Sequence, residues 1–408
     1  MTDPAPKTAP AQHQPPDGGA GPLADVLVID LSRALAGPHA AMMLGDQGAR
    51  VIKVEAPGHG DDTRGWGPPF VRPDPPSQGE RESTYFLSCN RNKESITLDL
   101  KDPAGAAVLT RLVRQADVLV ENFRTGVLDR LGFSMARLHE LNPGLIILSI
   151  TGFGHDGPEG GRPGYDQIAQ GEGGLMSLTG MSPDEPTRVG VPIADLLAGM
   201  YGAYGVLAAL HERDRTGRGQ VVRTSLLAGM VGVHAFQGTR YTVAGEVPGV
   251  AGRHHPSICP YGLFSAADGL VQIAVGSDRL WQSFAAAFGL ERPEWARNAD
   301  RVADREAVIA AVDAAFGGYP RERLMTILAE LGTPSGQVRS LDEVYEWEQT
   351  RSQGLLVEVD HSSLGALTLP GPPIRYDSGG RGRHQAPPTL GQHTGEILAW
   401  LDSVDPPD

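Results

Sequence analysis

The sequence predicts an α/β protein built around a parallel sheet with helices on both faces. Short runs of β-branched and other apolar residues, such as ADVLVIDLS (24–32) and LIILSITG (145–152), are typical of strands buried on both faces. Amphipathic segments alternate with these runs along the first half of the chain, as crossover helices do. The 53 glycines and 33 prolines among 408 residues indicate many tight loops between short elements.

The expected elements of the first half follow one another in β-α-β order. The first strand, 24–32, precedes a helix over 36–49, and VIKVE (51–55) is the next strand. Periodicity then predicts strand 95–100, helix 103–116, strand 117–123, helices up to Leu141 and strand 145–152. A long helix from about Asp195 to Arg213, a polar turn over 213–220 and a strand over 221–225 complete this half.

The second half predicts a smaller α/β unit. An apolar helix is expected over about 225–241, and the Gly- and Pro-rich loop 244–262 is a candidate domain boundary. Strand 270–275, helix 278–290 and helices within 304–331 make up the smaller unit. The β-rich segment 355–377 favours a large domain to which both ends of the chain contribute, and a last helix is expected over 393–401.

Composition and charge exclude several classes of function. A net charge of −14 argues against a general nucleic-acid binder, although an anion can still bind in a locally basic pocket. The two cysteines, Cys89 and Cys259, lie far apart, which disfavours a disulfide framework or a cysteine metal site, and no metal is expected. Residues 1–22 lack large apolar side chains and are expected to be a disordered tail without a signal pattern. No apolar run reaches the length of a membrane span, so we expect a cytoplasmic protein that binds neither membrane nor nucleic acid.

Two short motifs resemble functional sites, but each has a more ordinary explanation. GFGHDG (152–157) fits the dinucleotide pattern GxGxxG after a strand, but PEGGRPG follows it instead of a helix, which argues against a dinucleotide site. Cys259 lies near His254 and His255, yet a cysteine packed beside Pro260 is the more ordinary explanation. Walker A, GxSxG and HExxH patterns are absent from the sequence.

Basic and polar residues gather where strands of the sheet end. Ligands bind at the carboxyl ends of parallel strands, and basic residues there suit a phosphorylated ligand. Each of them taken singly could equally be a solvated surface charge. The residues are Arg91, Lys93 and Lys101 around the strand 95–100, and Asn122, Phe123, Arg124 and Arg130 after the strand 117–123.

Asp195 is a lone carboxylate in the apolar run GVPIADLLAG (190–199). A carboxylate beside so much apolar surface costs several kcal/mol unless it is compensated. Aspartate is a favoured helix N-cap, and the VPIA before it is loop-like, so capping is one interpretation. A helix N-terminus also keeps a carboxylate ionised and able to attack. The small residues around it, Ala194, Ala198, Gly199 and Gly202, would leave room for another group to approach.

Several long segments resemble the class III CoA-transferase family. They are VIDLSRALAGPHAAMMLGDQGARVIKVEAPGHGDDTR (28–64), SCNRNKESITLDLKDPAG (88–105), ADVLVENFRTGVLDRLG (116–132), HERDRTGRGQ (211–220), SGQVRSLDEV (335–344) and LGQHTGEIL (390–398). The family includes formyl-CoA:oxalate and carnitine CoA-transferases, and α-methylacyl-CoA racemase is a relative. The likeness runs in the same order from about Leu23 to Leu401.

The resemblance implies the role of Asp195. The family's nucleophilic aspartate stands in a segment of the form of VPIADLLAG (191–199). That carboxylate attacks the acyl-CoA thioester to give a mixed anhydride, and the CoA thiolate returns to form an aspartyl-CoA thioester that passes CoA to the acceptor acid. A site sheltered from water would protect these species from hydrolysis. CoA and its esters are then substrates, and no tightly bound cofactor is expected.

The resemblance also implies the residues that contact CoA. Lys101 and Arg130 would bond phosphates, Phe123 would pack near the pantetheine or adenine, and Ala36 would offer its backbone. Ala56 replaces an arginine that some members have near the adenine. The full set of implied contacts, including two residues that line the cleft in relatives, is Ala36, Leu98, Lys101, Asn122, Phe123, Arg130, Arg162 and Tyr165.

Further features of the family guide the choice of reaction. Racemase relatives carry a histidine where this chain has Tyr165, and tyrosine is a poorer proton shuttle at neutral pH, so racemisation is the second choice. A non-catalytic acyl-CoA-binding protein, with Asp195 only a helix cap, is the third. AGRHHPSICPYG (251–262) stands where oxalate enzymes have a glycine-rich flap, which disfavours oxalate. The likeness is greatest to the succinate, glutarate and hydroxymethylglutarate branch, so the acceptor is expected to be a dicarboxylate whose distal carboxylate binds Arg253 with His254 or His255.

The family fold implied by the resemblance is a Rossmann-like large domain, a smaller domain and an interlocked homodimer. The implied division is a tail over 1–22, the first part of the large domain over 23–225, a linker helix and small domain over 226–335, and a return linker with the rest of the large domain over 336–408.

Overall fold

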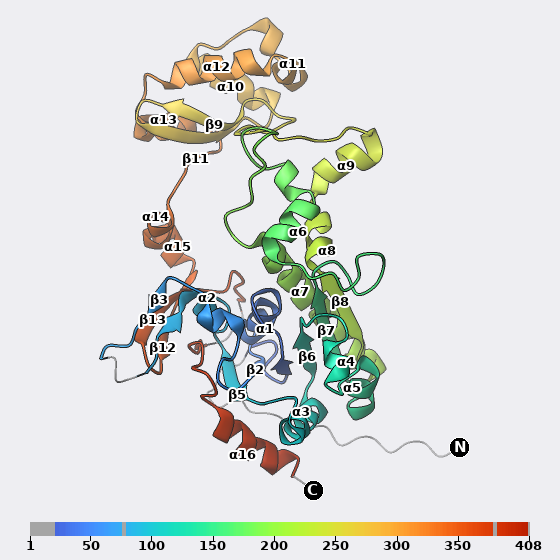
Figure 1. Ribbon diagram of the computed structural model, residues 1–408. Coiled ribbons are helices and arrows are strands. Elements are labelled where there is room, and N and C mark those ends of the chain that lie inside the picture. Colours follow the sequence, from blue (N-terminus) through green and yellow to red (C-terminus); the bar gives the residue numbers. More distant parts are fainter. Residues whose placement is uncertain (1–20, 76–78, 378–381, 407–408) are drawn as a thin grey trace. The chain divides into compact units, whose positions relative to one another are not determined.

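The computed structural model describes residues 21–75, 79–377 and 382–406 (Figure 1). These residues fall into two compact units, the first made of the described residues within 21–174, 190–238 and 349–406 and the second of 175–189 and 239–348. The unit boundaries at 238 and 348 lie later in the chain than the expected boundaries at 225 and 335. The expected N-terminal tail lies, apart from Gly21 and Pro22, outside the described residues.

The first unit contains the predicted parallel sheet. Its six strands are β1 (Leu27–Asp30), β2 (Arg50–Glu55), β5 (Lys93–Thr97), β6 (Val118–Glu121), β7 (Ile146–Thr151) and β8 (Val221–Ser225). Their order is β5-β2-β1-β6-β7-β8, and every neighbouring pair is parallel. The chain builds the sheet outward from β1 in one direction and then from β6 in the other. The loops after β1 and β6 therefore diverge at the centre of the sheet, the position where α/β proteins bind ligands.

Helices cover both faces of this sheet. The apolar core on one face joins the strands to α3 (Pro103–Gln115), α5 (Met135–Leu141) and the C-terminal α16 (Thr394–Val404). The other face carries α1 (Ala36–Asp46) and α7 (Ile193–Thr216), which contact each other. The remaining elements of the unit are α2 (Thr84–Ser88), α4 (Val127–Arg130), α6 (Asp166–Glu172), α8 (Leu226–Gly232), α15 (Glu348–Ser352) and the antiparallel pairs β3 (Phe70–Val71) with β4 (Glu82–Ser83) and β12 (Leu356–His361) with β13 (Gly365–Pro370).

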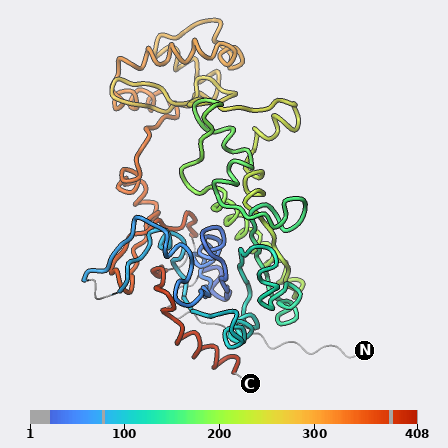
Figure 2. Tube along the Cα trace, in the orientation of Figure 1, coloured from blue at the N-terminus to red at the C-terminus, as the bar shows by residue number. Residues whose placement is uncertain are grey.

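Both ends of the chain contribute to the first unit, as the β-rich tail favours. Figure 2 shows the red C-terminal trace among the blue segments of this unit. The edge strand β5 is covered by that return: the Ser95 N–H donates to Nδ1 of His393 at 3.1 Å, and the His393 N–H donates to the Ser95 carbonyl at 2.9 Å. Covering the open edge in this way satisfies backbone groups that would otherwise invite pairing with another chain.

Helix α7 differs from the sequence expectation. It begins at Ile193 and extends to Thr216, and its most apolar 18-residue window has a mean hydropathy of 1.5. Length and composition alone would let it cross a membrane, a test that core helices of water-soluble proteins also meet. Within the first unit it packs against α1, α8, β7 and β8.

The helix expected over 225–241 is two helices, α8 and α9 (Ala235–Ala244). Ala235 has a φ of 47°, in the left-handed region, which interrupts helical geometry between them.

The second unit is the smaller α/β body. Its antiparallel sheet has the order β11-β10-β9, with β9 (Tyr261–Ala266), β10 (Gly269–Ala274) and β11 (Ser335–Gln337). The helices are α10 (Asp278–Phe288), α11 (Asn298–Ala303), α12 (Arg305–Phe316), α13 (Arg321–Glu330) and α14 (Leu341–Glu346). Aromatic side chains fill its core, with Trp281, Phe284 and Phe316 at most 2% exposed.

Candidate active site

Asp195 is the third residue of α7 and is half-buried in the first turn of that helix. The N-cap is Pro192, which offers no side-chain hydrogen bond. The capping interpretation of Asp195 is therefore wrong, because its own amide is already inside the helix. The first turn still places the carboxylate close to the positive end of the helix dipole.

Asp166, the first residue of α6, supplies the cap that Asp195 does not. Its Oδ1 accepts the backbone N–H of Ala194 at 2.8 Å, and its Oδ2 accepts an amide N–H of Gln170 at 2.7 Å. The first bond joins α6 to the start of α7, and the second, within α6, orients the Asp166 carboxylate. Asp166 follows Tyr165 directly, but nothing in its sequence surroundings indicates that it reaches a helix 27 residues further on, so sequence reasoning missed it.

The surroundings of Asp195 disfavour the ionised form of its carboxyl group. Burial, and secondly the negative charge of Asp166, raise the pKa of Asp195 to about 7. A carboxylate of that pKa is more basic than a solvated aspartate and is still ionised in a large fraction of molecules at neutral pH. Perturbed titration of this kind is typical of carboxylates that react.

Tyr85, on α2, belongs to the same electrostatic neighbourhood. Burial raises the pKa of its phenol, and the charge of Asp195 acts in the same direction, ahead of Asp166. Trp66 contacts the phenol ring edge-on, with ring centroids 5.1 Å apart. Sequence reasoning missed Tyr85 as well, since it lies in a five-residue helix distant in sequence from Asp195.

The raised pKa of Asp195 predicts how a reaction that needs its ionised carboxylate depends on pH. We expect the rate of any reaction in which this carboxylate attacks a substrate to fall as the pH drops below about 7, because a protonated carboxyl group is a poor nucleophile. Asp166→Asn should move the midpoint to lower pH, since asparagine keeps an oxygen for the Ala194 N–H but removes the charge. Initial rates measured between pH 5 and 9 test this, and an identical profile for both chains would contradict it.

The same shift predicts a stability difference with a definite sign. In the unfolded chain the Asp195 carboxyl returns to the ordinary aspartate pKa of 3.8, so between that value and about 7 the folded state holds a proton that the unfolded state releases. Stability therefore falls as the pH rises through this window. Asp195→Asn is expected to melt at a higher temperature than the unchanged chain at pH 8, with the difference shrinking toward pH 4. Equal melting temperatures at pH 8 would show that Asp195 is not destabilised by its surroundings.

The small residues around Asp195 serve helix packing. Ala194 and Ala198 are completely buried, and a Cβ added to Gly199 would lie 2.6 Å from the carbonyl oxygen of Ala36. Gly199 thus allows α7 to touch the start of α1. The expectation that these residues leave room for another group to approach is met at these positions by α1 and α8, which occupy the space.

Buried charged side chains hold the loop between β1 and α1 and the first turn of α1. Nζ of Lys53 donates to the Ser32 carbonyl at 2.9 Å, and Nζ of Lys93 donates to the Pro38 carbonyl at 2.8 Å. Asp61 accepts the N–H of Ala34 at 3.2 Å, where the backbone has a φ of 64°. These bonds stabilise a conformation that alanine rarely adopts.

This network corrects part of the basic cluster expected from sequence. Lys93 is fully enclosed, 2.8 Å from Asp30, and Arg91 pairs with Asp46 at 2.5 Å. The prediction that these two cations face a phosphate is therefore wrong. Both charges are needed inside the protein, where an unpaired carboxylate would be costly.

Asn122 and Phe123 begin the loop after β6. The Asn122 side chain accepts the Arg33 N–H at 2.8 Å and donates to the Arg33 carbonyl at 2.7 Å, so it joins this loop to the one after β1. The guanidinium of Arg33 lies over the Phe123 ring, 5.7 Å from its centroid. Ala36, the first residue of α1, directly follows the loop after β1 and is 3% exposed.

Lys101 and Arg130 are exposed at the same end of the sheet, after β5 and at the end of α4. Within the described ranges, neither side chain forms a hydrogen bond or an ion pair, so both cations are available to a ligand. Leu98, just after β5, is 8% exposed and belongs mainly to the core.

Arg162 and Tyr165 lie on the segment that leads into α6. Arg162 pairs with Glu172 at 2.7 Å and with Glu159 at 3.2 Å, and it stacks on the Phe153 ring at 4.4 Å. Tyr165 is 66% exposed and immediately precedes Asp166.

Arg253 and His254 lie in the second unit. The His254 ring packs edge-on against Phe264, 5.0 Å between centroids, and burial lowers its pKa. Its backbone forms a bridge to Gly262. His254 therefore supports the start of β9, whereas Arg253 is exposed.

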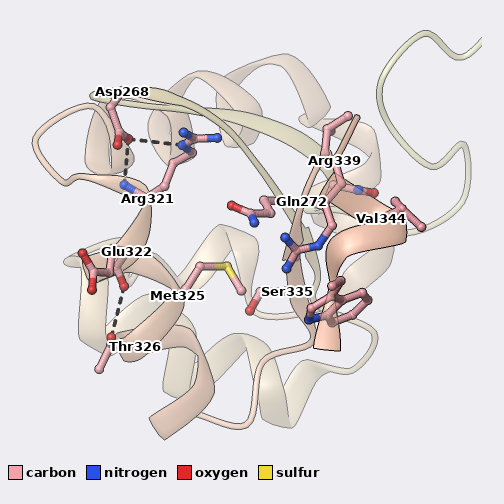
Figure 3. A pocket seen from close by; sticks show the side chains of 13 residues that line it. Asp268, Gln272, Arg321, Glu322, Met325, Thr326, Ser335, Arg339 and Val344 are labelled. Carbon is pink, nitrogen blue, oxygen red and sulfur yellow. Dashed lines mark hydrogen bonds and ion pairs between the residues drawn. The ribbon is translucent and has the colours of Figure 1, made fainter. Parts of the chain in front are cut away.

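The second unit also has a cavity of about 1010 Å³ beside β10, β11 and α13 (Figure 3). The charged side chains that line it already have partners within the cavity wall. Asp268 lies 3.6 Å from Arg321, and the guanidinium of Arg339 stacks on the Trp347 ring at 4.4 Å. None of the predicted site residues lines this cavity. Among the residues that the structure describes, no cluster of histidine, cysteine and acidic side chains could hold a metal ion.

Comparisons with known proteins agree with these features. The sequence profile of CoA-transferase family III matches residues 23–394. The chain is 38% identical over 384 residues to succinyl-CoA:glutarate CoA-transferase of Mus musculus, covering 92% of this chain and 86% of that protein. It is 37% identical to acetyl-CoA:oxalate CoA-transferase of Acetobacter aceti, covering 90% of this chain and 92% of that protein. The crystal structure of a CAIB/BAIF family protein from Brucella suis superposes with a TM-score of 0.83 at 39% identity, over 94% of this chain and all of that one.

Proposed function

The chain belongs to CoA-transferase family III and is a CoA-transferase, and from that premise we propose that it moves CoA from succinyl-CoA or a similar ester to a dicarboxylic acid. The observation that carries the proposal is the Asp195 carboxyl group, held in the first turn of α7 with a pKa raised to about 7. The names of similar proteins, which act on glutarate and oxalate, support a dicarboxylate as acceptor.

The proposed mechanism uses Asp195 as a covalent carrier. A carboxylate oxygen attacks the thioester carbonyl, the carbon–sulfur bond breaks, and CoA leaves as a thiolate beside a mixed anhydride. The thiolate attacks the aspartyl carbonyl of that anhydride, which releases the donor acid and leaves an aspartyl-CoA thioester. The acceptor carboxylate then attacks this thioester and expels the thiolate to form a second anhydride. Attack of the thiolate on the acceptor's carbonyl gives the new CoA ester and restores Asp195.

The CoA ester is proposed to bind at the loops after β1, β5 and β6. Lys101 and Arg130 would pair with phosphates, Phe123 would contact the pantetheine or adenine, and Ala36 would offer its backbone N–H. Asn122 contributes by holding the backbone of Arg33, since its side-chain oxygen accepts the Arg33 N–H and its side-chain nitrogen donates to the Arg33 carbonyl. For the distal carboxylate we propose Arg253, which is exposed, with His254 or His255 as its neighbour; the His254 ring also packs against Phe264.

Removing a phosphate-binding cation should weaken substrate binding without slowing the chemistry. For Lys101→Ala and Arg130→Ala we expect KM for the CoA ester to rise about tenfold with kcat nearly constant, because phosphate contacts are made equally in the ground and transition states. Arg137→Ala, an exposed arginine on α5 that pairs with Glu140, is the matched control and should leave KM unchanged. Unchanged KM in both test variants would place the phosphates elsewhere.

One experiment separates the proposed reaction from its alternatives. The protein is incubated with succinyl-CoA and each of a series of C2–C6 mono- and dicarboxylates, and CoA esters are followed by mass spectrometry. A new ester that requires an acceptor supports transfer, and glutarate should exceed monocarboxylates. Deuterium entering at Cα of the acyl group without exchange would favour a racemase, and CoA binding without either reaction would favour a binding protein.

We further propose that the protein acts in the cytoplasm as an interlocked homodimer. The dimer is supported by the exposed apolar face of α7, where Met200, Tyr201 and Tyr204 are 47%, 40% and 72% exposed. Sedimentation equilibrium giving the mass of a single chain at micromolar concentration would contradict the dimer.

A further inference from the structure

The segment GFGHDG (152–157) follows β7 and carries a histidine that the proposed reaction does not use. The His155 ring is half-buried, and its Nε2 lies 2.8 Å from the hydroxyl oxygen of Ser149. Ser149, 2% exposed on β7, stands opposite Glu121 in the register of the neighbouring strand β6. The Ser149 hydroxyl donates to Oε1 of Glu121. Three side chains thus form one continuous chain of hydrogen bonds at the carboxyl ends of β6 and β7.

The direction of each bond follows from the protons available. A serine hydroxyl has one proton, and that of Ser149 is committed to Glu121. With Glu121 ionised, the Ser149 oxygen accepts an N–H from Nε2 of His155, which assigns the neutral ring to its Nε2–H tautomer. Burial and the charge of Arg223 lower the pKa of His155, with Asp156 acting in the opposite direction, which agrees with a neutral ring.

Glu121 connects this chain to the loop after β6. Its Oε2 accepts the backbone N–H of Phe123 at 2.9 Å and closes a turn over 121–123. The residue is 4% exposed, and among the described residues no cation pairs with it. Burial raises the pKa of Glu121, and the bonds from Ser149 and from the Phe123 N–H oppose that rise. Since no ion pair orients this buried carboxyl group, its orientation depends on those two hydrogen bonds.

The loop held in this way is the one proposed to receive CoA. Asn122, between Glu121 and Phe123, also clasps the backbone of Arg33 in the loop after β1. The hydrogen bonds from His155 through Ser149 to Glu121, together with those between Asn122 and Arg33, connect three loops at the carboxyl end of the sheet. These are the loops after β1, β6 and β7. Fixing loops before a ligand arrives lowers the entropy lost on binding.

We propose that His155 is a positioning residue for the CoA ester: it orients Ser149, Ser149 orients Glu121, and Glu121 fixes the Asn122–Phe123 loop in the conformation that binds CoA. This inference rests on the proposed function, because only there is Phe123 assigned to CoA.

Two substitutions at His155 separate its hydrogen bond from its bulk. His155→Leu removes the Nε2–H donor and fills most of the same space. In His155→Gln the side-chain amide can place an N–H near the same position, so this conservative variant should rescue the loss. His139→Leu is the matched control: it removes a half-buried histidine whose Nε2 lies 3.0 Å from the Leu145 carbonyl, at the amino end of β7 instead of the carboxyl end.

The experiment combines CoA titration calorimetry, steady-state kinetics with succinyl-CoA and glutarate, and amide hydrogen exchange of residues 121–126. For His155→Leu we expect Kd for CoA and KM for succinyl-CoA to rise about tenfold, with kcat within about twofold of the unchanged chain. Exchange over 121–126 should be faster in that variant before CoA is added. His155→Gln and His139→Leu should resemble the unchanged chain in all three measurements.

The outcomes distinguish this inference from the proposed function. If the unchanged chain binds CoA and transfers it, while His155→Leu has the same Kd and the same exchange, the positioning role is overturned and the proposed function stands. If His155→Leu raises Kd and KM and His155→Gln raises them equally, the positioning role is also overturned, because the effect would then not depend on the N–H donor at position 155. If the unchanged chain neither binds CoA nor transfers it, the proposed function fails, and the role of His155 toward CoA fails with it.

Discussion

Asp195→Asn is expected to abolish CoA transfer, lowering kcat by at least about 10⁴-fold, because a neutral amide cannot attack the thioester and no other group takes its place. CoA binding and the fold should be retained. The Asp195 side chain makes no hydrogen bond or ion pair within the described part of the chain, so the substitution breaks no such bond. Acyl-CoA formation followed by mass spectrometry and CoA binding followed by calorimetry measure the two effects.

The matched control for this variant is Asp166→Asn, the neighbouring acid. Asparagine at that position still accepts the Ala194 N–H, so transfer should continue with a shifted pH dependence. Activity in Asp195→Asn that persists when peptide mass spectrometry excludes deamidation would remove Asp195 as the nucleophile.

Chemical trapping tests the same carboxylate during turnover. Hydroxylamine added to the protein with succinyl-CoA should convert the aspartyl-CoA thioester or the anhydride into a hydroxamate on Asp195, with loss of activity. Peptide mass spectrometry locates the modification. Modification that maps to other carboxylates only, in a preparation that turns over normally, would contradict a covalent intermediate on Asp195.

Gly199→Ala is expected to have the second largest effect, although it adds one methyl group. The added carbon would lie 2.6 Å from the Ala36 carbonyl oxygen, and because that atom is backbone, α7 must move away from α1. Overpacking of this kind costs about 1–3 kcal/mol of stability. Moving α7 also displaces Asp195 relative to the CoA loops, so kcat should fall about 100-fold, since a shift near 1 Å is enough for such a loss. Urea unfolding and initial rates measure the two effects.

Gly395→Ala is the control for this substitution. Gly395 lies in α16 with no atom within 4 Å of an added Cβ, so alanine should be accepted and should stabilise the helix by about 0.5–1 kcal/mol. Equal stability and kcat of Gly199→Ala and the unchanged chain would show that the contact between α7 and α1 is not as close as the structure places it.

The parallel sheet was predictable from sequence because its strands are buried on both faces. Strands such as Val118–Glu121 and Ile146–Thr151 read as continuous apolar runs, and a run of that kind has few alternatives to a central strand. The break between α8 and α9 was not predictable in the same way. Residues 225–241 have helical periodicity throughout, and nothing in that pattern marks Ala235 as the residue with a φ of 47°.

The candidate site shows a similar division. Asp195 stands out in sequence because an acid inside an apolar run is costly and needs a reason. Asp166 and Tyr85 have no such mark, and only their contacts in space relate them to Asp195. Arg91 and Lys93 misled the sequence reading for the opposite reason: a basic residue looks the same in sequence whether it meets a ligand or a buried carboxylate.

The sequence by itself determined the α/β class, the family and the aspartate on which the proposed chemistry depends. The class follows from the periodicity of apolar residues, and the family and the aspartate follow from short motifs. Tertiary structure alone decided that Asp166 caps α7, that Gly199 is needed for the approach of α1, and that Glu121, Ser149 and His155 form one chain of hydrogen bonds. The physical reason is that a pKa, a close contact and a shared proton depend on distances between groups far apart in sequence, and only folding sets those distances.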